Sequence, residues 1–199
     1  MSEGAFVRQG QPRDRAALFE ICLRTADTGA DATALYSDPD YPGQVWSAPY
    51  LELEPRHCFV LDSGGEAVGY VVGTPDTMAF EARLEREWWP ALRVRYGDRQ
   101  PVAAFDGRVL EAIRTPESEG ELARRYPAHL HINLLPAFQS GGWGRKLIEA
   151  ELDSLRRVGA PAVFLGVGLT NARAIGFYAH VGFERVEGPA NALWFARQL

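Results

Sequence analysis

A glycine-rich run between positions 139 and 145 has the residue types and spacing of an anion-binding turn. The run Gln139-Ser140-Gly141-Gly142-Trp143-Gly144-Arg145 leads into a segment with helical periodicity. A helix N-terminus presents unpaired backbone N–H groups and the positive end of the helix dipole, and glycines let a phosphate lie against the backbone. Arg145 can add a charge-assisted hydrogen bond. The run predicts a phosphate site built of backbone; the alternative is a helix start that is merely rich in glycine.

Two other phosphate-binding motifs do not fit these residues. A P-loop needs GxxxxGK followed by Ser or Thr, whereas Lys146 here follows Arg145 and precedes Leu147. The dinucleotide motif GxGxxG after a first strand is also missing from this run. Gly166-Val167-Gly168 echoes it weakly and is better explained as the end of a strand.

Composition limits the classes of partner. The chain has 199 residues, a net charge of −5 and a pI near 5.4, whereas nucleic-acid binding requires a basic face. Cys22 and Cys58 stand far apart without a Cys/His cluster, so neither a disulfide framework nor a metal site is predicted. No apolar run approaches the ~20 residues of a membrane-spanning helix, and MSEGAFVRQG at the N-terminus lacks an apolar signal core. We expect a cytoplasmic protein with no nucleic-acid or membrane partner.

From residue 130 onward the pattern alternates strand, helix, strand, helix, strand. A helical apolar stripe follows the glycine-rich run and stops at Gly159, a good C-terminal cap. Asn171 can cap the next helix, which ends at Gly182. The strands of this part are expected at 130–135, 162–167, 183–187 and 193–196.

The N-terminal part supplies further strands. A strand is expected at 5–8 and a helix from about Pro12. Apolar runs at 57–61 and 67–72 flank a glycine-containing turn, which predicts a β-hairpin.

Two regions are less regular. Residues 26–55 are acidic, aromatic and rich in proline, and are expected to form a long loop with a binding surface. Residues 76–127 are expected to form a helical insertion over the substrate side. Together these features predict one domain over residues 1–199 of the α/β (α+β) class, with a mixed central sheet of six to seven strands flanked by helices.

Two motifs on either side of the strand at 162–167 resemble a known family. The cofactor motif of the GNAT acetyltransferases is Q/R-x-x-G-x-G/A, where x is any residue. A similar pattern, Gln139-x-x-Gly142-x-Gly144, follows Leu134-Leu135-Pro136 in this chain. The second signature of that family runs from Asn171 through Phe177-Tyr178 to Gly182-Phe183. The resemblance implies the GNAT fold and acetyl-CoA (coenzyme A) as cofactor.

Shorter segments over most of the chain resemble the acetyltransferase-like domain at the C-terminus of animal O-GlcNAc hydrolases. These segments are residues 27–33, 48–50, 73–77, 87–90 and 129–133. The present chain retains the loop glycines, so we expect it to bind the cofactor, as a stand-alone homologue of bacterial type.

The family resemblance implies a direct transfer, in which an amine attacks the acetyl carbonyl of acetyl-CoA and the coenzyme leaves as a thiolate. The pyrophosphate would lie on the N–H groups of Ser140 to Arg145, and the pantetheine arm would pair with the backbone near Leu134. A backbone N–H near Leu135 would stabilise the oxyanion. The implied cofactor-binding residues are Leu134, Leu135, Gln139, Ser140, Gly141, Gly142, Trp143, Gly144, Arg145, Asn171, Phe177 and Tyr178.

Three residues are candidates for proton transfer. Tyr178 matches the tyrosine that protonates the departing sulfur in many family members, although it shares a helical stripe with Phe177 and packing is the alternative. The general base is open between Asp76, just past the end of a strand, and His131, on the strand that leads to the glycine-rich run. Each has a structural alternative as well.

The acceptor is expected on the N-terminal side of these motifs. Carboxylates among tyrosines and a tryptophan favour a cationic amine by charge and by cation–π contact; alternatively, the aspartates only cap turns. The expected acceptor-binding residues are Asp27, Asp31, Tyr50, Asp76 and Asn133.

The sequence leaves three functions open. The first is an N-acetyltransferase, monomeric or homodimeric, that acts on the primary amine of a small molecule, an amino sugar or a lysine side chain of a peptide. The second is a module that binds acetyl-CoA or a peptide without chemistry. The third is a scaffold whose glycine-rich turn binds nothing.

Overall fold

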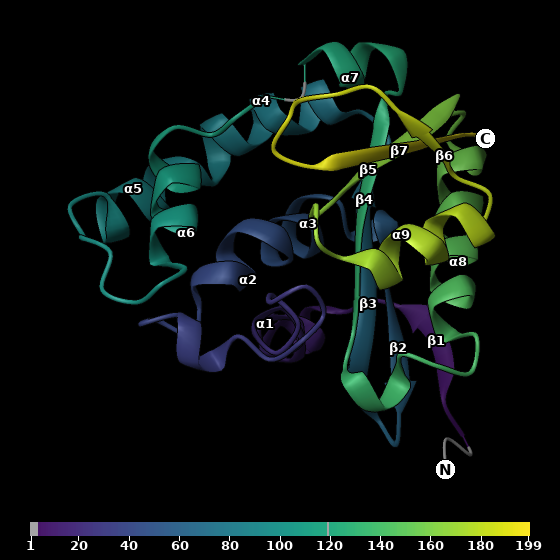
Figure 1. Ribbon diagram of the computed structural model, residues 1–199, viewed down its shortest axis with the longest axis horizontal. Coiled ribbons are helices and arrows are strands. Elements are labelled where there is room, and N and C mark those ends of the chain that lie inside the picture. Colours follow the sequence, from purple (N-terminus) through teal and green to yellow (C-terminus); the bar gives the residue numbers. More distant parts are fainter. Residues whose placement is uncertain (1–3, 119) are drawn as a thin grey trace.

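The computed structural model of the protein describes residues 4–118 and 120–199. A seven-stranded mixed sheet forms its centre, in the spatial order β1-β2-β3-β4-β5-β7-β6 (Figure 1). This confirms the predicted α/β class with helices around a mixed sheet. The strands are β1 (Phe6–Gln9), β2 (Cys58–Ser63), β3 (Glu66–Thr74), β4 (Ala128–Leu134), β5 (Ala162–Val167), β6 (Glu184–Val186) and β7 (Leu193–Gln198).

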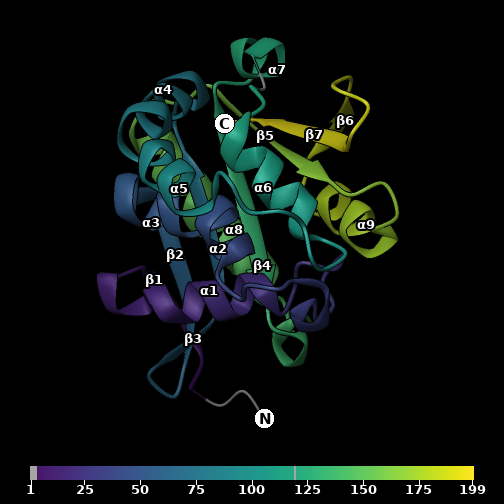
Figure 2. The ribbon, with the colours of Figure 1, turned by 90° about the vertical axis from the view of Figure 1, so that its left-hand side faces the viewer.

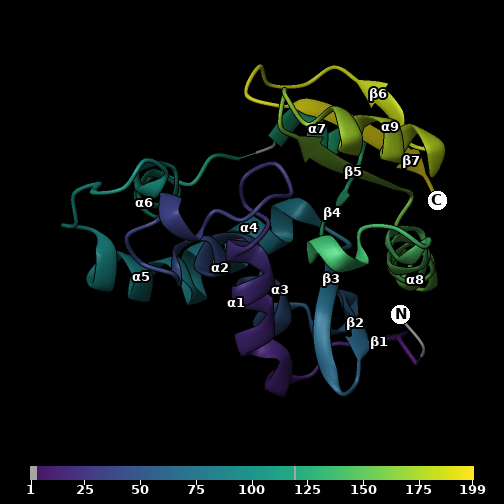
Figure 3. The same ribbon diagram turned by 60° about the horizontal axis from the view of Figure 1, so that its bottom comes forward.

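Helices cover both faces of this sheet (Figure 3). α8 (Trp143–Arg157), which follows the glycine-rich run, packs on β1 to β4 from one side. α1 (Arg15–Leu23) and α3 (Ala48–Leu53) pack on β3 from the other side. α9 (Ala172–His180) joins the α8 side, where Tyr178 packs with Phe183 and Phe195. None of the helices within residues 4–118 and 120–199 is long and apolar enough to cross a membrane.

The region 26–55 differs from the loop expected there, because it contains α2 (Tyr41–Trp46) and α3. Pro42 and Pro49 lie in the first turns of these two helices. Proline is tolerated at a helix start, since the first helical N–H groups have no intrahelical acceptor. The expectation of a loop throughout is therefore wrong, because prolines that suggest irregular structure in the sequence begin helices in the fold.

Among the described residues, four helices lie between β3 and β4. They are α4 (Thr77–Glu87), α5 (Trp89–Tyr96), α6 (Asp106–Arg114) and α7 (Gly120–Arg125). In Figure 2, α5 and α6 lie in front of the sheet, on the side of α1 and α2. Their buried residues Leu92, Tyr96 and Leu110 share one core cluster with Tyr41 of α2. Short 3-10 turns at Pro12–Asp14, Thr33–Leu35, Pro55–His57 and Pro136–Phe138 complete the described elements.

The parallel neighbours β4 and β5 diverge along their length. They pair only at Ala128↔Val163 and His129↔Phe164, although both strands continue further. On its other edge β4 pairs with β3 up to Leu134, and the Leu135 amide donates to Val68 O at 3.0 Å. Backbone groups alternate in direction along such a ladder, so the peptide groups of Ile132 and Leu134 point toward β5. These peptide groups have no β-strand partner among the described residues, although the Leu134 carbonyl accepts from the Gln139 side chain at 2.8 Å.

Glu151 of α8 is a fully buried carboxyl on the side of the sheet away from α1. Neither carboxyl oxygen has a hydrogen bond among the described residues, although His57 Nδ1 lies 3.3 Å from Oε1. Burial raises the pKa of Glu151 to about 9, and burial also lowers the pKa of His57. Both groups are therefore neutral at neutral pH.

We expect Glu151→Gln to stabilise the protein at alkaline pH only. The folded chain holds a proton on Glu151 that the unfolded chain releases above the ordinary carboxyl pKa, so the contribution of Glu151 to wild-type stability is fully present below about pH 4.5 and is lost as the pH rises toward 9. The amide removes this loss. Thermal unfolding should give a Tm gain of roughly 2–8 °C at pH 8.5 and almost none at pH 5. The exposed Glu149→Gln on the same helix is the control, and equal gains for both variants would contradict the account.

Candidate active site

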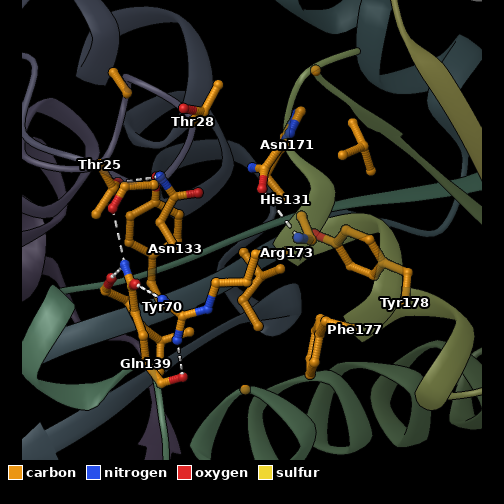
Figure 4. Close-up of a pocket in the computed structure, with 18 of the residues that line it drawn as sticks. Thr25, Thr28, Tyr70, His131, Asn133, Gln139, Asn171, Arg173, Phe177 and Tyr178 are labelled. Atoms are coloured by element: carbon orange, nitrogen blue, oxygen red, sulfur yellow. Dashed lines mark hydrogen bonds between the residues drawn. The ribbon is translucent and has the colours of Figure 1, made fainter.

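A cavity of about 850 Å³ opens where β4 and β5 diverge. It extends between the N-terminus of α8, α9 and the turn after α1, and Figure 4 shows Thr25 and Thr28 of that turn opposite Asn171 and Tyr178. His131 and Asn133 enter it from β4, and Tyr178 enters it from α9. The cavity thus joins the glycine-rich run to two of the three residues predicted for proton transfer, His131 and Tyr178.

The glycine-rich run forms a left-handed turn that starts α8. Gly141 and Gly142 both have φ of +80°, a region that residues with a Cβ rarely adopt. Gly144 faces the ring of Phe177, because a Cβ there would lie 3.1 Å from Cζ. The first amide of α8 with a backbone acceptor is that of Lys146, which donates to Gly142 O at 3.2 Å. The preceding amides of the turn are available to an anion.

Basic side chains surround this turn. Arg145 Nη2 lies 3.0 Å from Nε2 of His180, and both residues line the cavity. Arg173 of α9 reaches across the pocket to Gln139 (Figure 4), with Nη1 2.6 Å from Oε1 and Nη2 2.6 Å from the carbonyl oxygen. This end of the cavity is therefore positively charged and suits a phosphate-bearing ligand.

The side chain of Gln139 connects three segments. Its amide nitrogen donates to Leu134 O at 2.8 Å and to Gly29 O at 3.0 Å, while its oxygen accepts from Arg173. These bonds tie the end of β4 to the turn after α1 and to α9. The Gln139 side chain is thus occupied by the protein itself.

Two residues on α9 have distinct surroundings. Asn171 caps the helix, as predicted, by accepting from the Ala174 amide at 3.0 Å, and it lines the cavity. Tyr178 is buried between the rings of Phe177, Phe183 and Phe195, with centroids 5.3, 5.9 and 6.0 Å away. Its hydroxyl has no hydrogen-bond partner among the described residues, and burial raises its pKa above the usual value. The hydroxyl keeps its proton at neutral pH.

A hydrogen-bonded cluster lies behind His131. His131 Nε2 is 3.1 Å from the hydroxyl of Tyr50, and the same hydroxyl is 2.7 Å from Nε2 of His129. His129 Nδ1 is 2.8 Å from Oγ1 of Thr77, which donates to Pro127 O at 2.7 Å. Burial lowers the pKa of His131 to about 4 and that of His129 to about 3. Both rings are neutral at neutral pH.

The carboxylates expected at the acceptor do not line the cavity. Asp76 is exposed and caps α4 by accepting from the Ala79 amide at 3.0 Å. Asp31 is exposed and accepts from Thr33, and Asp27 forms a short bridge with Ala30. Within residues 4–118 and 120–199, no Asp or Glu lines this cavity, whereas Arg108 of α6 does. Asp76 and Asp31 therefore bind nearby backbone amides, of Ala79 and Thr33, at positions outside the cavity lining.

The model of the acetyltransferase (GNAT) family matches residues 23–183 of the chain. The chain belongs to this family. It is also 25% identical over 202 residues to protein O-GlcNAcase of Rattus norvegicus, over 97% of this chain and 22% of that relative. The chain thus corresponds to about a fifth of the relative's length. Both results confirm the resemblances found in the sequence.

Solved structures show the same fold. SsHAT is 39% identical, with a TM-score of 0.90 and 98% of each chain covered. The putative acetyltransferase yncA from Salmonella typhimurium, solved with its cofactor acetyl-CoA, is 20% identical, with a TM-score of 0.58 over 98% of this chain and 94% of that one. The seven-stranded sheet is therefore a GNAT fold.

The GNAT motifs place most of the predicted cofactor-binding residues around one cavity. Its lining includes Leu134, Gln139, Gly142, Trp143, Gly144, Arg145, Asn171, Phe177 and Tyr178. Leu135, Ser140 and Gly141 are not among its lining residues. The Leu135 amide is already bonded to Val68, so the amide that faces the gap is that of Leu134.

Sequence reasoning did not select several polar residues that line this GNAT cavity, among them Thr25, Arg108, Arg173 and His180. Thr25 accepts a hydrogen bond from the side chain of Asn133. Arg173 lies two residues after the cap Asn171, and His180 two residues after Tyr178, but no local signal distinguishes them. Their position depends on how α8 and α9 pack.

Proposed function

We propose that the protein transfers the acetyl group of acetyl-CoA directly to a primary amine of a small molecule, an amino sugar or a lysine side chain. One observation carries this proposal: the cavity that opens between β4 and β5 contains both the free amides at the start of α8 and the side chain of Tyr178. The edge of β4 that has no strand partner thus lies between a phosphate site and an acid.

The cofactor would lie along this edge. The amides of Gly142 to Arg145, with Arg145 and His180 beside them, would hold the pyrophosphate. The pantetheine arm carries amide groups, and the peptide group of Ile132 that faces the gap would pair with them as a neighbouring strand does. The Leu134 amide would donate to the oxyanion that forms on the acetyl carbonyl.

Tyr178 would act as the general acid. The amine nitrogen forms a bond to the acetyl carbon, the C–S bond breaks, and the thiolate takes the phenolic proton of Tyr178. Burial raises the pKa of Tyr178, and the same environment would raise that of a thiol formed beside it. The proton would therefore pass from the Tyr178 hydroxyl to the thiolate of coenzyme A, and burial raises the pKa of both groups.

His131 is the better candidate for the base. It lines the cavity, whereas the Asp76 carboxylate is exposed and engaged in capping α4. The low pKa of His131 keeps its ring neutral. Although a neutral imidazole with this pKa is a weak base, the amine nitrogen becomes strongly acidic once it has attacked the carbonyl, so a weak base is then sufficient.

The proposal is tested by following thiol release from acetyl-CoA across a panel of primary amines. We expect release that depends on the amine, with a stoichiometric N-acetylated product. Tight binding of acetyl-CoA without transfer to any amine would instead favour a non-catalytic binding module. If acetyl-CoA did not bind measurably, both the acetyltransferase and the binding module would be overturned.

The lining of the cavity predicts which amines react best. An acceptor with a second positive charge would lose its hydration without gaining a carboxylate partner, while Arg108 would repel it. We therefore expect agmatine to have a kcat/KM at least about 10-fold below that of an amine with a neutral or anionic remainder, such as an amino sugar phosphate. Arg108→Gln should reduce this difference in kcat/KM between the two amines. A preference for agmatine in the wild type would contradict the prediction.

A further inference from the structure

We infer that the chain of hydrogen bonds Thr77–His129–Tyr50–His131 fixes the tautomer of His131, so that its proton is on Nε2 and its lone pair is on Nδ1 for the acceptor amine. The inference rests on the proposed function, because it makes His131 the catalytic base. Tyr50 and His129 are then positioning residues, since they act on the amine only through His131.

The direction of donation along these hydrogen bonds is set at Pro127. Its carbonyl oxygen can only accept, and Oγ1 of Thr77 lies 2.7 Å away. Two oxygens at this distance need a hydrogen between them. Thr77 has a single hydroxyl proton, so this proton points to Pro127, and Oγ1 can only accept from the next member of the chain.

The next member is therefore protonated on the side of Thr77. His129 Nδ1 lies 2.8 Å from Oγ1 and must donate to it. The ring is buried and neutral, with a pKa lowered to about 3 by burial and by His131, so it has one proton only. Nε2 of His129 is then an acceptor, and the Tyr50 hydroxyl, 2.7 Å away, donates to it.

The last step fixes His131. The hydroxyl proton of Tyr50 points to His129, so the nitrogen of His131 that lies 3.1 Å from the Tyr50 oxygen must donate to it. That nitrogen is Nε2. The ring of His131 is neutral, which leaves Nδ1 without a proton. Nδ1 has no hydrogen bond among the described residues, and the ring lines the cavity.

Aromatic packing holds the side chains of this hydrogen-bonded series in place. The ring of Tyr50 is stacked on Phe80 with centroids 4.6 Å apart, and its edge meets His129 and His131 at 5.5 and 5.4 Å. Tyr50 and Thr77 are almost fully buried. Water therefore competes little for these hydrogen bonds, and a single arrangement of protons is favoured.

The arrangement suits a base that becomes positively charged. Nδ1 takes the proton that the amine nitrogen loses as the N–C bond forms, and the C–S bond breaks as the thiolate takes the Tyr178 proton. Every hydrogen bond from His131 to Pro127 is then donated in the direction away from the imidazolium. This arrangement stabilises the positive charge on His131. A final proton transfer through water, from His131 to Tyr178, restores both groups.

The tautomer can be read directly by long-range ¹H–¹⁵N correlation in protein labelled at its four histidines, with assignment by His131→Gln. We expect the ring proton on Nδ1 in His129 and on Nε2 in His131. Tyr50→Phe should abolish the single tautomer of His131 and lower kcat by about 10-fold or more, with the KM for acetyl-CoA changed less than about 2-fold. Thr77→Val, of similar shape, should act in the same direction if Tyr50→Phe folds poorly.

Tyr96→Phe is the matched control, because Tyr96 also has a buried hydroxyl but lies outside the cavity. A proton on Nδ1 of His131 in the wild type would overturn the inference. So would a kcat of Tyr50→Phe equal to that of Tyr96→Phe. A wild type with the expected tautomers but no turnover would overturn the proposed function and support the tautomer assignment, which separates the two failures.

Discussion

Tyr178→Phe is expected to lower kcat by about 100-fold or more while the KM for acetyl-CoA changes less than about 2-fold. The change removes only the hydroxyl, which has no hydrogen-bond partner among the described residues. The ring contacts with Phe177, Phe183 and Phe195 remain. The thiolate then leaves without receiving a proton, so the variant is slower in C–S bond cleavage, and kcat falls.

Steady-state kinetics with saturating amine measures this effect. Tyr126→Phe is the control, because it deletes a hydroxyl from a half-buried ring outside the cavity. Thermal unfolding of both variants shows whether the fold is intact. If Tyr178→Phe retained the wild-type kcat, Tyr178 would have a packing role only, which is the alternative that its place on the apolar stripe of α9 suggests.

Gly142→Val should weaken acetyl-CoA binding by about 10-fold or more, which corresponds to about 1.4 kcal/mol or more. Gly142 has φ of +80°, and a β-branched residue would push the turn out of the left-handed region. The amides that follow would then point in other directions, and the phosphates would lose several donors at once.

Gly159→Val supplies a matched control for this variant. Gly159 lies after the other end of α8 with φ of +78°, and a Cβ added at either glycine would meet no other atom within 4 Å. The two substitutions therefore impose similar backbone strain, but only one lies at the cavity. Calorimetric titration with acetyl-CoA should separate them, and equal affinities would show that the turn does not hold the cofactor.

The glycine-rich turn and the cap of α9 could be predicted from the sequence because their determinants are local. The turn Gly141-Gly142 and the cap Asn171 are each set by residues within one turn of a helix, and the structure has both. The strand at 162–167 has the predicted bounds, because a short apolar run covered on both faces has clear ends. Local chemistry therefore predicts the turn and the cap that the structure contains.

The surroundings of His131 and of Asp76 could not be predicted, because they depend on contacts that the local sequence does not show. Tyr50 lies 79 residues from His129 and 81 from His131, yet its hydroxyl joins them. Asp76 follows a strand, as a catalytic carboxylate often does, but its side chain caps α4. Charge in a sequence does not tell whether an aspartate faces a cavity or a turn.

A crystal structure of the protein with acetyl-CoA would test the central claim most directly. The account predicts the pantetheine arm between β4 and β5, the pyrophosphate on the amides from Gly142 to Arg145, and the thioester sulfur within hydrogen-bond reach of the Tyr178 hydroxyl. A cofactor bound elsewhere, or with its sulfur beyond reach of Tyr178, would contradict it.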